Sequence, residues 1–184
     1  SWGDVAAIRK QWGGKFIIKG ILDVEDARAA VNVGADAIVV SNHGGRQLDG
    51  APSAIAALPE IVDAVGTQCE VWMDSGIRGG QDILRAIALG AKGTLVGRPF
   101  LYALGAAGEA GVLQMLEILH TELDKTMALC DGTVSVVDAA LDAISLPSSP
   151  ALTPMAPSGA TFFRSYPLHT IDPVLTAGGG VVDE

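Results

Sequence analysis

The densest group of polar residues in this sequence follows directly after a short apolar run at residues 37–40. The group consists of Ser41-Asn42-His43-Gly44-Gly45-Arg46-Gln47-Leu48-Asp49-Gly50. Histidine is the side chain best suited to proton transfer near neutral pH, and a guanidinium can hold a carboxylate through two hydrogen bonds. The glycines beside His43 would let a ligand approach the backbone closely. This spacing favours a general base at His43 and a carboxylate clamp at Arg46, with a purely structural loop as the alternative.

A second polar group is divided between two glycine-containing segments further along the chain. They read Asp74-Ser75-Gly76-Ile77-Arg78-Gly79-Gly80 and Gly97-Arg98-Pro99. Glycines at the start of a helix leave backbone N–H groups free for an anion, and arginines add charge-assisted hydrogen bonds. The two segments together predict a phosphate site, although arginines on an acidic protein could also serve only to solvate its surface.

Lys19 is the third candidate, because it comes at the end of the apolar run at residues 16–18 and is followed by Gly20. A lysine at the end of a strand usually just reaches solvent. If its strand is aligned with the others, however, its ammonium group would lie at the same edge as His43 and the phosphate segments. There it could neutralise a negatively charged ligand or form a Schiff base.

Each of these groups follows a short apolar run rich in Val and Ile. We therefore expect strands at residues 16–18, 37–40, 71–73 and 93–96. The segments between them have helical periodicity and begin near Asp23, Pro52 and Gln81, and a further amphipathic helix is expected at residues 111–128. This alternation is typical of βα units around a parallel sheet, in which ligands bind at the carboxyl ends of the strands.

A weak internal repeat supports this organisation. Residues 32–38 and 88–94 both end a helix in Gly-Ala and then start a strand, with glycine where a positive φ costs little. Repeated units favour a (β/α)8 barrel, and a doubly wound sheet is the rival. Because a complete barrel needs eight units and typically ~250 residues, the four units counted here would form half of one.

The composition indicates which broad class of protein this chain belongs to. The chain has 184 residues, is 49% hydrophobic and carries a formal net charge of −9, which predicts a soluble globular domain and no nucleic-acid partner. It has neither an apolar run long enough to span a bilayer nor a recognisable signal peptide, so we expect a cytoplasmic protein. Cys69 and Cys130 suggest neither a disulfide framework nor a metal site.

The composition changes after Cys130, because six of the nine prolines lie in residues 131–184. We interpret residues 1–130 as the half-barrel. Residues 131–184 are expected to form a short helix followed by an extended, proline-rich C-terminal arm.

Taken in order, the segments around Lys19, His43, Asp74 and Arg98 resemble the C-terminal half of the FMN-dependent 2-hydroxy acid dehydrogenases and oxidases. Members of this family act on glycolate, lactate or mandelate. The resemblance covers roughly residues 2–130 and rests chiefly on the Ser-Asn-His-Gly-Gly-Arg-Gln string. It implies the C-terminal half of a (β/α)8 TIM barrel, with four βα units plus an extended C-terminal tail.

The resemblance also implies a flavoprotein oxidoreductase with FMN as its cofactor. The reaction would convert an (S)-2-hydroxy acid into a 2-oxo acid, with His43 as the base and Arg46 as the partner of the substrate carboxylate. The remaining implied roles all concern the flavin: Lys19 and Ser41 at the ring, Asp74 at the ribityl chain, and Ser75, Gly76, Ile77, Arg78, Gly97 and Arg98 at the phosphate.

Segments that the family carries in the first half of its barrel have no counterpart in this sequence. The resemblance therefore implies a partner, either a separate N-terminal half-barrel chain or an N-terminal segment, and a homo-oligomer of the complete barrel. The alternative is a non-catalytic half-barrel that binds a phosphate ligand or serves as an assembly subunit.

Overall fold

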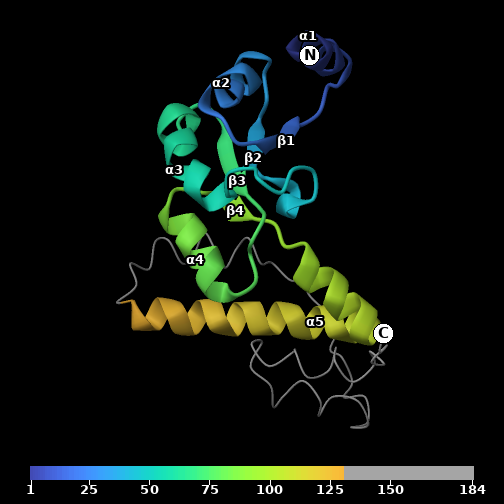
Figure 1. Cartoon of the computed structure of the whole chain (residues 1–184), viewed down its shortest axis with the longest axis vertical. Helices are drawn as coiled ribbons and strands as arrows, with labels where there is room; N and C mark the ends of the chain where they lie inside the picture. Colours follow the sequence, from blue (N-terminus) through green and yellow to red (C-terminus); the bar gives the residue numbers. More distant parts are fainter. Residues whose placement is uncertain (131–184) are drawn as a thin grey trace, which may run out of the picture. The chain divides into compact units, whose positions relative to one another are not determined.

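The computed structural model describes residues 1–130, drawn in colour in Figure 1. The helix and the proline-rich arm expected in residues 131–184 lie outside the described residues. The elements are α1 (Trp2–Gln11), β1 (Ile17–Ile21), α2 (Val24–Asn32), β2 (Ala37–Val40), the 3-10 turn η1 (His43–Gly45), α3 (Ala54–Val65), β3 (Glu70–Met73), α4 (Gly80–Ala88), β4 (Gly93–Thr94) and α5 (Arg98–Leu129).

The four strands form one parallel sheet in the order β1-β2-β3-β4. The helices α2, α3 and α4 follow one another along one side of this sheet (Figure 1). A doubly wound sheet reverses its strand order at a switch point, and no such reversal occurs within residues 1–130. The arrangement is that of a segment of barrel wall, with strands inside and helices outside.

The core lies between the sheet and its helices. Alternate strand residues such as Ile38, Val40 and Val71 are fully buried there against helical residues such as Leu58 and Leu123. The other face of the sheet carries the residues in between, with Lys19, Val39, Trp72 and Gly93 paired across the strands. In a barrel this second face is the interior.

The signals that begin and end the helices are confirmed. The Asp23 carboxylate accepts hydrogen bonds from the amides of Glu25 and Asp26, at 2.8 and 3.2 Å, and so caps the start of α2. In the internal repeat, Gly34 and Gly90 have φ values of +86° and +99° and follow the ends of α2 and α4. Both helix ends carry the paired backbone bonds of a Schellman motif, which explains why the repeat requires glycine.

Two strands differ in length from the expected ones. The first extends from residue 17 to Ile21, so Lys19 lies within it, and the pairing with β2 shifts register between Lys19 and Ile21. Gly20, with φ of +100°, lies in this irregularity. The fourth strand, expected at 93–96, is assigned only at Gly93–Thr94, although the Leu95 amide still bonds to the Met73 carbonyl at 2.9 Å.

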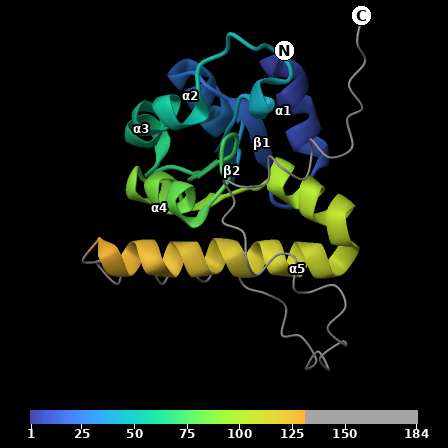
Figure 2. The same ribbon diagram turned by 60° about the horizontal axis from the view of Figure 1, so that its bottom comes forward.

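Two helices also differ from the expected pattern. The expected helix at 111–128 is the second part of α5, which begins already at Arg98 and is broken at Ala107 and Gly108. Figure 2 shows the two parts meeting at an angle. The α1 helix was not expected, because its apolar residues form no buried stripe: none of its residues is buried. No helix within residues 1–130 is both long and apolar enough to cross a membrane.

Candidate functional site

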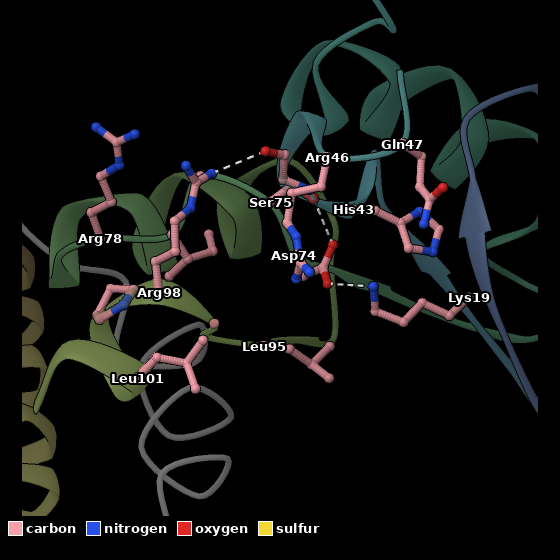
Figure 3. A pocket seen from close by; sticks show the side chains of 15 residues that line it. Lys19, His43, Arg46, Gln47, Asp74, Ser75, Arg78, Leu95, Arg98 and Leu101 are labelled. Atoms are coloured by element: carbon pink, nitrogen blue, oxygen red, sulfur yellow. Dashed lines mark hydrogen bonds and ion pairs between the residues drawn. The ribbon is translucent and has the colours of Figure 1, made fainter. Parts of the chain in front are cut away.

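The loops that follow β2, β3 and β4, together with Lys19 of β1, surround one open cavity of about 280 Å³ (Figure 3). It is lined by Lys19, His43, Gly44, Arg46, Gln47, Asp74, Ser75, Gly76, Ile77, Arg78, Leu95, Gly97, Arg98, Pro99 and Leu101. Every site residue predicted from the sequence lines this cavity except Ser41, which is 1% exposed and bonded to Lys19 beneath its floor. The three polar groups therefore form a single site, because carboxyl ends of parallel strands meet at one edge of the sheet.

The Lys19 ammonium group is held by two partners from neighbouring strand ends. Its Nζ lies 2.6 Å from Asp74 Oδ2 and donates a hydrogen bond of 2.8 Å to Ser41 Oγ. Figure 3 shows the Lys19 side chain reaching toward Asp74. Because these partners hold the ammonium group against the sheet, its charge has a defined position at the cavity floor.

The Asp74 carboxyl is ionised although it is only 17% exposed. Burial would raise its pKa, but hydrogen bonds from Lys19, Ser41 and Ser75, with the charge of Lys19, outweigh burial and hold the pKa below the ordinary value of 3.8. The charged form is thus favoured in the folded state.

A pH dependence of stability follows from this lowered pKa. The contribution of Asp74 to the free energy of unfolding is fully present above pH 3.8 and is lost as the pH falls through the lower folded-state value. We expect Asp74→Asn to lower the stability by roughly 1–2 kcal/mol at pH 7. In urea unfolding of the chain assembled with its complementary half, the difference in stability between wild type and Asp74→Asn should narrow as the pH falls from 7 to 2.5, whereas a constant difference would contradict this assignment.

Side chains add to the backbone hydrogen bonds that close the 3-10 turn at His43, in which the Gly45 amide bonds to the Asn42 carbonyl at 3.0 Å. Asn42 Oδ1 accepts a bond of 3.2 Å from the Gly45 amide, and Asn42 Nδ2 donates to the Pro52 carbonyl at 3.2 Å. His43 itself has φ of +57°, a conformation that side chains rarely adopt. Its ring lies beside Gly20, where a Cβ would come within 2.8 Å of His43 Cε1. Gly20 therefore leaves room for the imidazole ring.

The predicted phosphate segment has free backbone donors mainly in the loop that precedes α4. The Gly80 amide donates to Glu122 Oε2 at 2.9 Å, and the Arg78 amide donates to Asp82 Oδ2 at 3.1 Å. Within residues 1–130 the amides of Gly76 and Ile77 have no hydrogen-bond partner. Of the two glycines expected to leave N–H groups for an anion at the start of α4, Gly80 has its amide occupied by Glu122, whereas the amide of Gly79 has no partner within residues 1–130. The loop before the helix offers the further donors of Gly76 and Ile77.

The cavity is cationic although the chain as a whole is acidic. Four cationic side chains line it, Lys19, Arg46, Arg78 and Arg98, against the single carboxylate of Asp74. Arg98 also begins α5, and its Nη2 donates a bond of 3.2 Å to the Gly44 carbonyl. A cavity with this charge, amides at one end and a histidine at the other is suited to an anionic ligand.

Several lining residues were not singled out from the sequence. Gln47 and Pro99 belong to the polar segments already recognised, so their position could have been extrapolated. Leu95 and Leu101 are apolar residues that contribute an apolar wall near Arg98. Only the short β4 and the early start of α5 bring these two leucines to the cavity, and the sequence carries no signal for either.

Residues 1–145 match the model of the FMN-dependent dehydrogenase family. The L-lactate dehydrogenase of Pectobacterium atrosepticum is 55% identical over 144 residues, which are 78% of this chain and 37% of that protein. The L-lactate dehydrogenase of Actinobacillus pleuropneumoniae is 59% identical over 129 residues, which are 70% of this chain and 34% of that protein.

Solved structures of mandelate oxidase are also similar. The structure with (S)-4-hydroxymandelic acid is 51% identical, with a TM-score of 0.70, and the match covers 78% of this chain and 39% of that one. A variant with a monooxide FMN adduct has the same identity and TM-score. This likeness confirms the barrel over the doubly wound sheet. The chain spans somewhat more than a third of the length of the curated relatives it matches, and it belongs to the FMN-dependent dehydrogenase family.

Proposed function

We propose that this chain supplies the flavin-binding wall and the proton acceptor of an enzyme that oxidises a 2-hydroxy acid to a 2-oxo acid with FMN. The observation that carries the proposal is the single cavity in which His43 and Arg46 lie beside a cluster of anion donors. A histidine near a guanidinium can take a proton from a substrate that the guanidinium holds by its carboxylate.

The donor set fits FMN. A phosphate group needs several N–H donors and positive charge, which the loop amides of Gly76 and Ile77 and the Arg98 guanidinium offer together. Glycine at position 44 keeps this cradle open, since a Cβ there would come within 3.1 Å of Arg98 Nη2. Lys19 would lie at the ring, where its ammonium favours negative charge.

Each polar residue of the cavity would then contact one part of either the hydroxy acid or FMN. Bound FMN would accept the two electrons that the hydroxy acid loses. One of the two protons lost with them goes to a ring nitrogen of His43 and the other would go to the reduced flavin, while Arg46 orients the carboxylate. The residues that would hold the flavin are Lys19 and Ser41 at the ring, Asp74 at the ribityl chain, and Ser75, Gly76, Ile77, Arg78, Gly97 and Arg98 at the phosphate.

Lactate and mandelate are the substrates that the relatives' names support. Arg46 accounts only for the carboxylate shared by these acids and by glycolate. Selectivity among these acids would depend on the pocket for the substrate side chain, which we expect the N-terminal half of the barrel to form.

Anaerobic reduction of the flavin tests the proposed function. The chain, purified with any partner that accompanies it, is loaded with FMN and mixed with L-lactate, glycolate or (S)-mandelate. We expect at least one of the acids to bleach the flavin absorbance, with the matching 2-oxo acid as the product. A colourless protein that cannot be reconstituted with FMN would instead support the non-catalytic phosphate-binding half-barrel.

We further propose that the chain pairs with a complementary N-terminal half of the barrel, and that the complete barrel forms a homo-oligomer. Within residues 1–130, β1 and β4 each have only one paired neighbour, so both edges of the sheet are open. The interior face also exposes apolar surface, because Ile17 is 46% exposed. Open edges and an uncovered apolar face favour pairing with another segment.

The chain alone is therefore expected not to fold cooperatively. Size-exclusion chromatography with light scattering should show aggregation of the isolated chain, and recovery of a defined species when the complementary half is co-expressed. A monodisperse, cooperatively unfolding monomer of 18.8 kDa would contradict the pairing.

A further inference from the structure

The His43 turn belongs to a closed ring of contacts that joins three strand ends. Lys19 Nζ contacts Asp74 and Ser41, at 2.6 and 2.8 Å. Ser41 Oγ accepts the His43 amide at 3.1 Å. On the other side, Ser75 Oγ accepts the Gly44 amide at 3.1 Å and donates to Asp74 Oδ1 at 2.8 Å, which closes the ring.

The Gly44 peptide connects this ring of contacts to the phosphate cradle, which consists of the amides of Gly76 and Ile77 and the guanidinium of Arg98. Its N–H is held by Ser75, which directly precedes the unpaired amide of Gly76. Its carbonyl accepts from Arg98, at the first turn of α5. The Gly44 peptide, which directly follows His43, is thus bonded on one side by Ser75 and on the other by Arg98.

We propose that Ser75 and Arg98 are positioning residues that couple occupation of the phosphate cradle to the orientation of His43. An anion held by Arg98 and the Gly76 amide fixes the guanidinium and the Ser75 segment, and both then hold the Gly44 peptide in place. Because His43 has a φ of +57°, which residues other than glycine rarely adopt, its conformation depends on contacts of this kind. By thermodynamic linkage, the orientation of His43 in turn affects the affinity of the phosphate cradle for its anion.

The inference rests on the proposed function, and a comparison of flavins with and without the phosphate group tests it. Riboflavin carries the same ring without the phosphate, so the difference between the two flavins isolates the occupied cradle. The readout, in the chain purified with its complementary half, is the Cε1–H NMR signal of His43, assigned by its absence in His43→Asn, with His120 in α5 as an internal reference outside the cavity. Inorganic phosphate serves as a third probe that carries no ring.

Ser75→Gly is the informative variant. It removes the hydroxyl that bonds Gly44, and glycine accepts the φ of +71° at this position without strain. Ser53→Gly is the matched control, because the Ser53 side chain makes no capping hydrogen bond. Gly44→Ala is a second variant, which would disturb the Arg98 contact from the other side.

In wild type and Ser53→Gly we expect FMN to shift the His43 signal further than riboflavin does. Inorganic phosphate without any flavin should also shift this signal. In Ser75→Gly and Gly44→Ala both differences should disappear. The rate of anaerobic flavin reduction should be about tenfold higher with FMN than with riboflavin in wild type, and this ratio should fall toward one in Ser75→Gly. A merely structural role would slow both flavins equally.

Equal His43 signals with FMN and riboflavin in wild type would overturn the coupling, as would an unchanged difference in Ser75→Gly. If neither flavin binds but phosphate still shifts the His43 signal in wild type and not in Ser75→Gly, the coupling stands and the proposed flavin chemistry fails.

Discussion

Replacing His43 with alanine is expected to lower turnover by about 10²–10⁴-fold while FMN stays bound. The change removes the imidazole that would take the proton, but it leaves the His43 amide, which bonds Ser41, in place. The anion donors around Gly76 and Arg98 are not touched. Flavin binding and proton transfer therefore depend on separate side chains within one cavity.

The measurement combines flavin content, from absorbance after gel filtration, with the rate of anaerobic reduction. His43→Asn is the conformational control, because asparagine tolerates the φ of +57° better than alanine and also lacks a base. Both variants should retain FMN and lose turnover. If both lose the flavin instead, the turn is structural and His43 is not the proton acceptor.

Arg46→Lys provides the contrasting signature. Lysine keeps the positive charge but replaces the planar fork with a point charge. We expect KM for carboxylate substrates to rise about 10- to 100-fold, which corresponds to the loss of one charge-assisted hydrogen bond. The rate at saturating substrate should change much less. Loss of turnover without a rise in KM would show that Arg46 does not hold the carboxylate.

A large effect on stability is expected for Gly80→Ala, which should lower the free energy of unfolding by about 3 kcal/mol or more. Gly80 begins α4 where that helix packs against α5, and a Cβ there would overlap the Leu123 nitrogen and lie 2.7 Å from the Leu119 carbonyl oxygen. The obstacles are backbone atoms, which cannot rotate away. The same helix start also donates its amide to Glu122 at 2.9 Å. Separation of the two helices would break this bond as well.

Gly105→Ala is the matched control for this change. Gly105 lies within α5 and has no atom within 4 Å of a Cβ built there. Alanine should therefore be neutral or stabilise the helix by up to about 1 kcal/mol. Urea unfolding of both variants, in the same purified assembly, gives the comparison. Equal stability of Gly80→Ala and wild type would show that α4 and α5 do not approach each other as described.

The site could be predicted from the sequence to the extent that it depends on which residues follow each strand. The strand at 37–40 and the His43 segment are contiguous, and the Asp74 and Arg98 segments follow their own strands in the same way. In a parallel sheet all carboxyl ends lie at one edge, so the order of elements already brings these groups together. Helix starts and the glycines of the repeat were predictable for the same reason, since caps depend on adjacent residues.

The tertiary structure alone decided which of these groups bond to one another. Lys19 of β1 reaches Asp74, which follows β3, across the end of the intervening strand β2, because the parallel register of the three strands aligns these positions. Glu122 takes the Gly80 amide from 42 residues away, and Arg98 reaches the Gly44 carbonyl across 54. Local sequence specifies backbone preference and side-chain type, whereas such contacts depend on how helices pack and strands align. The packing of helices and the alignment of strands minimise the free energy of the whole chain, so they cannot be inferred from any short segment of the sequence.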